Sequence, residues 1–174
     1  MIVRRVRVNY DHRLSKTLAL LANPGLLLAS TKRSGASNVM TIGWGTVGII
    51  WGKPLFVVLV RPSRYTYGFI HDSGVFTVNV PTEEMREWVN LCGTRSGREL
   101  DKFAACGLKT TPGHMVDAVT IDACPMVYEC RVVHHNDVLP PNLAPEIERS
   151  SYRGSDYHRV FYGEILGAYA AEGW

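Results

Sequence analysis

The residues best suited to chemistry lie at 61–66, Arg-Pro-Ser-Arg-Tyr-Thr, between an apolar run at 54–60 and a segment with the pattern of a helix. A helix start carries about half a positive charge and exposes unpaired backbone N–H groups. Arginines are unfavourable there unless an anion offsets them. Two guanidinium groups with the hydroxyls of Ser63 and Thr66 therefore indicate a phosphate monoester site. The alternative is that the arginines are solvated or pair with acids elsewhere.

A second candidate is the extended segment 38–41, Asn-Val-Met-Thr. Alternation along a strand would place Asn38 and Met40 on one side and Thr41 on the other, while backbone amides could face a planar ligand. A half-exposed strand near a turn is the simpler explanation.

The third candidate is the loop at 91–97, which contains Cys92, Gly93 and Ser96 between two predicted helices. It could present backbone amides, together with Lys102, to a ligand. An ordinary turn explains the same residues equally well.

Nucleophilic and metal chemistry are disfavoured. Cys92 has no base beside it in the sequence. His134 and His135 follow Cys130 but lack a second ligand pair, and on a strand they would point to opposite faces. His158 opens the last long strand after a loop and could overhang a site, or be a solvated histidine at a strand end. The sequence contains no Gly-x-Gly-x-x-Gly, Walker loop or Gly-x-Ser-x-Gly, which removes the main support for Rossmann, kinase and α/β-hydrolase functions.

The length of 174 residues predicts a single domain over 1–174, which leaves no separate nicotinamide module. A net charge of +3 gives no indication of nucleic acid as a partner. Four cysteines without a Cys-x-x-Cys pair predict a reduced, cytoplasmic protein. The most apolar stretch, 18–29, is interrupted by Asn-Pro-Gly and predicts no membrane anchor. The arginine-rich start, 4–7, is interpreted as a solvated tail, with a dimer arm as the alternative.

The predicted elements are mostly strands. We expect strands at 26–32, 38–44, 54–60, 74–80, 126–134 and 158–168. The strand at 54–60 should be buried on both faces, whereas Thr77 and Asn79 should give the strand at 74–80 one polar face. Helices are expected after Ser15 as N-cap, over 63–71 with Ser63 as N-cap, over 81–91, and from a capping box at Ser96 to residue 107. This order predicts a mainly β fold, an antiparallel barrel with peripheral helices.

The ordered segments resemble the flavin reductase-like, FMN-binding split-barrel family, particularly its flavoredoxin-like branch. The matching pieces are 38–44 (NVMTIGW), 61–67 (RPSRYTY), 76–81 (FTVNVP), 92–97 (CGTRSG), 101–103 (DKF) and 157–165 (YHRVFYGEI). Each piece is weak alone, but six in family order are specific for the family.

The resemblance implies an antiparallel split β-barrel that forms a homodimer with FMN near the subunit interface. It further implies NADH or NADPH as electron donor and a catalytic role for His158 near the flavin face. The implied flavin contacts are Asn38, Met40, Thr41, Trp44, Arg61, Ser63, Arg64, Thr66, Asn79, Cys92, Gly93, Ser96 and Lys102. A flavin reductase, an FMN electron carrier that serves a protein acceptor, and a split barrel that has lost FMN remain as alternatives. The polar, proline-containing segment 136–156 departs from the family pattern and leaves the substrate open.

Overall fold

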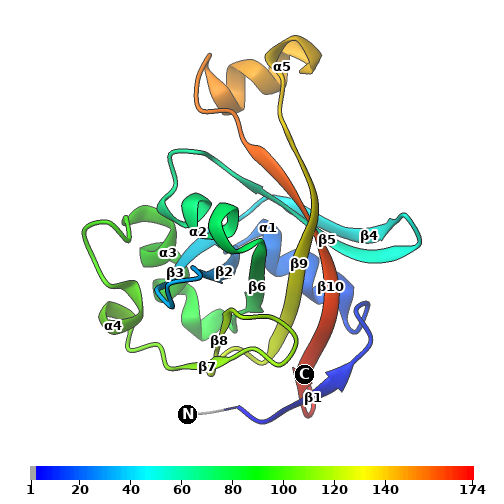
Figure 1. Cartoon of the computed structure of the whole chain (residues 1–174), viewed down its shortest axis with the longest axis vertical. Helices are drawn as coiled ribbons and strands as arrows, with labels where there is room; N and C mark the ends of the chain where they lie inside the picture. The colour runs from blue at the N-terminus through cyan, green and yellow to red at the C-terminus, as the bar shows by residue number, and fades with distance from the viewer. Residues whose placement is uncertain (1–2) are drawn as a thin grey trace.

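An eight-stranded sheet forms the centre of the computed structural model, which describes residues 3–174 (Figure 1). The strands pair in the order β3-β2-β6-β9-β10-β5-β4, with β1 paired to the outer part of β10, and every pairing is antiparallel. The sheet strands are β1 (Arg5–Val8), β2 (Leu26–Thr31), β3 (Ser37–Ile42), β4 (Gly45–Ile50), β5 (Lys53–Val60), β6 (Val75–Val80), β9 (Met126–Asp137) and β10 (Arg159–Ala171). The sheet ends at β3 and β4. These strands follow each other in the chain but do not pair with each other, so the sheet curls into a barrel that stays open.

Short helices and a small second sheet cover the sides of this barrel (Figure 1). The helical elements are α1 (Leu14–Ala22), α2 (Tyr65–Ser73), the 3-10 turn η1 (Glu83–Met85), α3 (Arg86–Thr94), α4 (Lys102–Cys106), η2 (Pro140–Asn142), α5 (Pro145–Ile147) and η3 (Glu148–Tyr152). Strands β7 (Thr110–Pro112) and β8 (Val119–Ile121) pair with each other. This arrangement confirms the predicted mainly β, antiparallel fold with peripheral helices. No helix within residues 3–174 is long and apolar enough to cross a membrane.

Two hydrophobic clusters hold these layers together. Inside the barrel, Phe56 of β5 meets Tyr128 of β9 edge to face, with 5.3 Å between ring centroids, and both rings are fully buried. On the other side of the sheet, Leu27 of β2 and Val39 of β3 pack with Val89 of α3. Strand β2 is therefore buried on both faces, and α3 is fixed against the strands that border the site described below.

The starts of the helices differ from the predictions. Helix α1 begins at Leu14 after Arg13, with no side-chain cap, so Ser15 is not its N-cap. The predicted capping box at Ser96 is a turn, in which the Ser96 hydroxyl accepts the N–H of Arg98. Helix α4 begins later because Asp101 caps it, accepting the N–H of Ala104 at 3.1 Å. The predicted helix at 81–91 begins with the turn η1 and continues as α3 to Thr94.

The predicted polar face of β6 is present, but β8 covers its polar side chains. Both Thr77 and Asn79 are fully buried. The Asn79 amide donates to the carbonyl of Leu27, and its Oδ1 accepts the N–H of Ile121 at 2.8 Å. Thr77 donates to the carbonyl of Val119. These side chains replace the backbone hydrogen bonds that would otherwise join the second sheet to the first.

The arginine-rich start is also not a solvated tail. Residues Arg5–Val8 form β1 on β10. The Arg5 guanidinium donates to the carbonyls of Ile121 and Cys124 at 2.9 and 2.7 Å. Sequence patterning missed this strand because a four-residue edge strand has no apolar run of its own.

Between β9 and β10 the chain leaves the sheet for residues 138–157, which we call the excursion (Figure 1). It consists of the short turns η2, α5 and η3 and projects beyond one end of the barrel. The N–H of Val138 donates to the carbonyl of His158 at 2.9 Å and closes its base. The excursion thus begins and ends beside His158.

Candidate functional site

A cavity of about 500 Å³ lies where β3, the start of α2, the segment after α3 and the start of β10 meet. It is lined by every predicted site residue except Asn79. Asn79 lies instead in the buried link between β6 and β8, where both ends of its amide are bonded to protein. It is therefore a structural residue, and the prediction that it contacts a ligand is not supported by its position.

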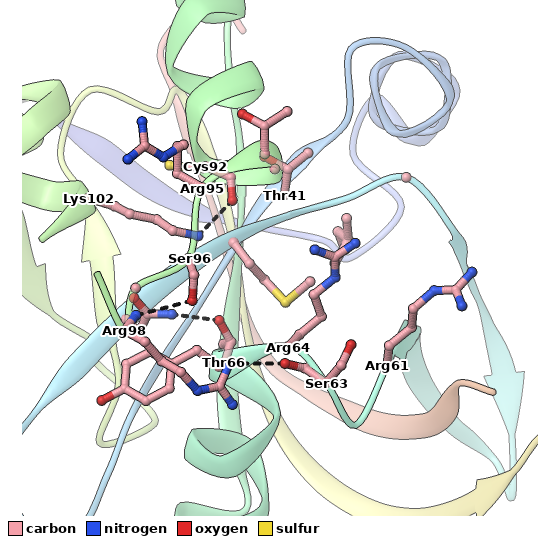
Figure 2. Close-up of a pocket in the computed structure, with 18 of the residues that line it drawn as sticks. Thr41, Arg61, Ser63, Arg64, Thr66, Cys92, Arg95, Ser96, Arg98 and Lys102 are labelled. Atoms are coloured by element: carbon pink, nitrogen blue, oxygen red, sulfur yellow. Dashed lines mark hydrogen bonds between the residues drawn. The ribbon is translucent and has the colours of Figure 1, made fainter. Parts of the chain in front are cut away.

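Four cationic side chains gather at one end of the cavity: Arg64, Arg95, Arg98 and Lys102 (Figure 2). Within residues 3–174 none of them forms an ion pair with a carboxylate, although Glu99 also lines the cavity. Arg98 donates to the carbonyl of Ser63 at 3.0 Å, which ties the segment after α3 to the start of α2. The chain thus folds four positive charges around one space that holds a single carboxylate.

Lys102 is the most constrained of these cations. Its side chain is buried, and in the described part of the chain its ammonium group has one hydrogen-bond partner, the carbonyl of Cys92 at 2.7 Å (Figure 2). An ammonium group has three donors. Burial lowers the pKa of Lys102. A buried cation at a cavity wall with two donors left over fits an anionic ligand.

Cys92 lines the same wall, and it is almost fully buried. Burial raises the pKa of its thiol to about 12. The thiol is therefore protonated at neutral pH, and the residue acts through its backbone carbonyl, in agreement with the prediction that it is no nucleophile.

The first turn of α2 contributes to the cationic end. Helix α2 begins at Tyr65, with Arg64 as its N-cap and without any side-chain cap. The prediction of Ser63 as N-cap is wrong, because the Ser63 hydroxyl donates to Asp156 Oδ2 at 2.6 Å. The helix therefore presents uncapped N–H groups beside the buried hydroxyl of Thr66.

Arg61 differs from Arg64 in its partners. The Arg61 guanidinium donates to the carbonyls of Ser151 and Asp156 at 2.8 and 2.9 Å, and it lies 3.9 Å from the Asp156 carboxylate. In Figure 2 it lies at the opposite side of the group from Lys102, with its guanidinium directed away from it. Arg61 borders the cavity but holds the excursion, so the predicted phosphate contact from this residue competes with existing bonds.

Uncharged residues of β3 also line the cavity. The Asn38 amide donates to Thr66 Oγ1 at 2.8 Å, and Thr41 donates to the carbonyl of Val89. The segment after α3 approaches β3 closely at Gly97, where a Cβ atom would lie 2.2 Å from Asn38 Oδ1. A larger residue at Gly97 would push the loop off β3, so this glycine sets the width of the cavity.

Trp44 and His158 form a part of the cavity wall that we call the aromatic end. Trp44, which is 45% exposed, lies with its ring centroid 5.0 Å from that of His158. His158 is buried, and its Nδ1 lies 2.9 Å from the hydroxyl of Tyr152 in the excursion. Burial, with a smaller contribution from Arg61, lowers the pKa of His158 to about 4. The imidazole is therefore neutral at pH 7.

Sequence reasoning did not single out several of the residues that line the cavity, among them the cations Arg95 and Arg98, and it also missed Tyr152 beside the cavity. Arg95 lies in the predicted loop and Arg98 in the predicted capping box, and their charges were the available signal. No sequence pattern marks Tyr152, because only the fold of the excursion brings its hydroxyl to His158.

An open antiparallel barrel with a cationic pocket beside its edge strand β3 defines the class of this protein as a split-barrel, ligand-binding domain. The chain belongs to the flavin reductase like domain family, whose profile matches residues 19–173. The family resemblance expected from the six sequence segments is thereby confirmed.

Individual relatives agree with this assignment. The chain is 33% identical over 129 residues to an uncharacterized protein of Archaeoglobus fulgidus; the match covers 74% of this chain and 63% of that protein, less than two thirds of its length. Flavoredoxin of Desulfovibrio vulgaris is 27% identical, with a TM-score of 0.68 over 86% of this chain and 70% of that one. A Shewanella frigidimarina protein with a split barrel domain, at 17% identity, has a TM-score of 0.68 over 95% of this chain and 76% of its own. The predicted split-barrel fold is confirmed.

Proposed function

We propose that this chain binds FMN in the cavity and acts as a flavin reductase that uses NADH or NADPH. The observation that carries the proposal is the group of four cations around the uncapped start of α2, which have no carboxylate partner in the described part of the chain. Guanidinium groups and helix N-termini are typical ligands of a phosphate group. Membership of the flavin reductase like family supports FMN as the molecule that carries this phosphate.

The residues present fit such a ligand. Arg64 and Lys102 would hold the phosphate, with Thr66 and Ser96 as further polar contacts. The volume of about 500 Å³ lies within the range of small-molecule sites. Met40, Thr41 and Trp44 continue the wall toward the uncharged end, where the ring system would lie. Bound FMN supplies the redox chemistry, accepting a hydride and passing electrons onward.

The aromatic end of the cavity suits the electron donor. Trp44 offers a half-exposed ring, and His158 lies beside it with a neutral imidazole at pH 7. His158 would therefore orient the donor by a hydrogen bond and would not act as a proton donor.

We further propose a homodimer formed through the edge strand β4. This strand pairs only with β5 in the described chain, and the hairpin between them exposes Ile49 and Trp51, at 57% and 62%. Contiguous exposed apolar side chains on a sheet edge are typical of an interaction surface. Because β4 starts next to Trp44, a second copy on this edge would border the cavity.

Anaerobic mixing of the FMN-loaded protein with NADH or NADPH tests the reductase function. We expect bleaching of the flavin absorbance with at least one nicotinamide, at a rate above that of free FMN. The similarity to a flavoredoxin supports an electron carrier for a protein acceptor as the second candidate. Bleaching by dithionite with no response to either nicotinamide would reject the reductase and favour this carrier.

A further inference from the structure

The excursion places one buried side chain at the cavity. Tyr152 is the only buried residue of η3, and its hydroxyl meets Nδ1 of His158 at 2.9 Å in a buried hydrogen bond. No other partner of this hydroxyl occurs among residues 3–174. The contact joins a segment that projects from the barrel to a residue that lines the cavity.

Tyr152 is fixed in place from several sides. The Arg61 guanidinium carbon lies 5.2 Å from the centroid of its ring, and Arg61 also donates to the carbonyl of the preceding residue, Ser151. Tyr157 stacks on the ring at a centroid distance of 4.9 Å and an interplanar angle of 21°. Trp44 meets its edge at 6.3 Å. The hydroxyl of Tyr152 therefore has little freedom to turn away from His158.

This geometry selects one tautomer of His158. If Nδ1 carried the proton, it would donate to the tyrosine oxygen, and the buried hydroxyl of Tyr152 would have no acceptor in the described chain. Leaving a buried donor without a partner is unfavourable. The favourable arrangement has the hydroxyl donating to a bare Nδ1, with the proton on Nε2. In the described chain no protein group bonds to Nε2.

We propose that Tyr152 is a positioning residue that holds His158 as the neutral Nε2–H tautomer, so that the compound bound beside Trp44 must present a hydrogen-bond acceptor such as a carbonyl oxygen. The ligand part rests on the proposed function, because the compound would lie in the cavity together with FMN. A neutral imidazole N–H donates without transferring its proton. Planar carbonyl compounds, including the carboxamide of a nicotinamide, can both pack against the Trp44 ring and accept a hydrogen bond from Nε2–H of His158. Purely apolar rings of the same size can pack against Trp44 but cannot accept this hydrogen bond.

The tautomer is read directly by NMR of the flavin-free protein labelled with ¹⁵N-histidine, in which the two ring nitrogens give distinct shifts. His158→Gln identifies the signals of His158. We expect the Nε2–H tautomer in the wild-type protein at pH 7, and a substantial Nδ1–H population in Tyr152→Phe. Tyr157→Phe is the matched control and should leave the tautomer unchanged, because the Tyr157 hydroxyl donates to Glu148. An Nδ1–H tautomer in the wild-type protein, or no change in Tyr152→Phe, would overturn the positioning role.

The ligand part is tested by titrating the FMN-loaded protein with benzaldehyde and with toluene, an apolar ring of similar size that lacks the carbonyl, and following the flavin spectrum. We expect the aldehyde to bind at least tenfold more tightly, and this preference to fall below threefold in His158→Phe. Equal binding of the two compounds, or a preference that survives His158→Phe, would reject the acceptor requirement. A protein that takes up no FMN would contradict the proposed function and the ligand assignment with it, whereas the NMR measurement would still decide the role of Tyr152.

Discussion

The carboxylate of Asp156 lies at the start of α2, where the Ser63 hydroxyl donates to its Oδ2 at 2.6 Å and the Ser63 N–H to its Oδ1 at 3.3 Å. The excursion thus supplies an anion at one side of the cationic end. This position neighbours the one proposed for the FMN phosphate, so the two negative charges would repel each other.

The substitution Asp156→Asn removes this charge but keeps the shape of the side chain. Asparagine also tolerates the left-handed backbone of this residue, with φ of 52°. We expect FMN to bind several-fold more tightly, since relieving a nearby like charge contributes roughly 1 kcal/mol, while riboflavin binds as before. Fluorescence titration of both flavins measures the effect. Weaker FMN binding would show that Asp156 supports the phosphate site.

Lys102 predicts a pH dependence of FMN binding. In the proposed site the phosphate would bind the protonated amine, and burial lowers the pKa of this amine in the free protein below its usual 10.5. FMN affinity should therefore be full below that lowered pKa and should fall as the pH rises through it. Measuring FMN affinity between pH 7 and 9.5, with riboflavin as reference, tests this expectation.

A matched pair of variants isolates the lysine. Lys102→Met should weaken FMN about tenfold or more at pH 7, from the loss of a charged hydrogen bond, and should abolish the pH dependence. Lys109→Met, at an exposed position, should do neither. Retention of the pH dependence in Lys102→Met would assign it to another group.

His158 makes folding stability depend on pH. Its pKa is lowered from 6.5 to about 4, so between these values the unfolded chain binds a proton that the folded chain does not. Stability from this residue is present above pH 6.5 and is lost as the pH falls toward 4. The lost free energy of unfolding at pH 4.5 is about 2–3 kcal/mol, at about 1.36 kcal/mol per pKa unit. Urea unfolding at pH 7 and 4.5 should show this loss reduced in His158→Gln but not in His71→Gln. Equal losses in all three proteins would contradict the burial of a neutral imidazole.

Trp51 tests the proposed dimer edge. It is 62% exposed at the tip of the hairpin from β4 to β5. Light scattering after size-exclusion chromatography should give twice the chain mass of 19.4 kDa for the wild-type protein and the single chain mass for Trp51→Asp. Met115→Asp, which alters an exposed methionine outside this hairpin, should remain a dimer. A wild-type monomer would contradict the interface.

Local sequence patterns predicted the strands and turns that depend on residues close together in the chain. The β-branched run of β5 and the turn residues between β2 and β3 are clear local signals, and the structure has both the strand and the turn. Features set by distant contacts were missed. The polar face that Thr77 and Asn79 give β6 was predicted, but its burial under β8 was not. The strand β1 exists only because β10 extends far enough to pair with it.

The site follows the same rule. The charges at Arg64 and Lys102 are visible in the sequence and meet in the cavity as the motifs indicated. Arg61 was grouped with them because it is near in sequence, whereas its partners come from the excursion, 90 residues away from it at Ser151. No local pattern can connect residues across such a distance.

The central claim is that the cationic end of the cavity binds the phosphate of FMN, and the affinity of the flavin-free protein for FMN and riboflavin tests it most directly. We expect FMN to bind at least about 100-fold more tightly, corresponding to roughly 3 kcal/mol from charged hydrogen bonds to the phosphate. Arg64→Ala should remove much of this difference, while Arg61→Ala should remove little of it. Equal affinities for FMN and riboflavin in the wild-type protein, or no binding of either, would contradict the account.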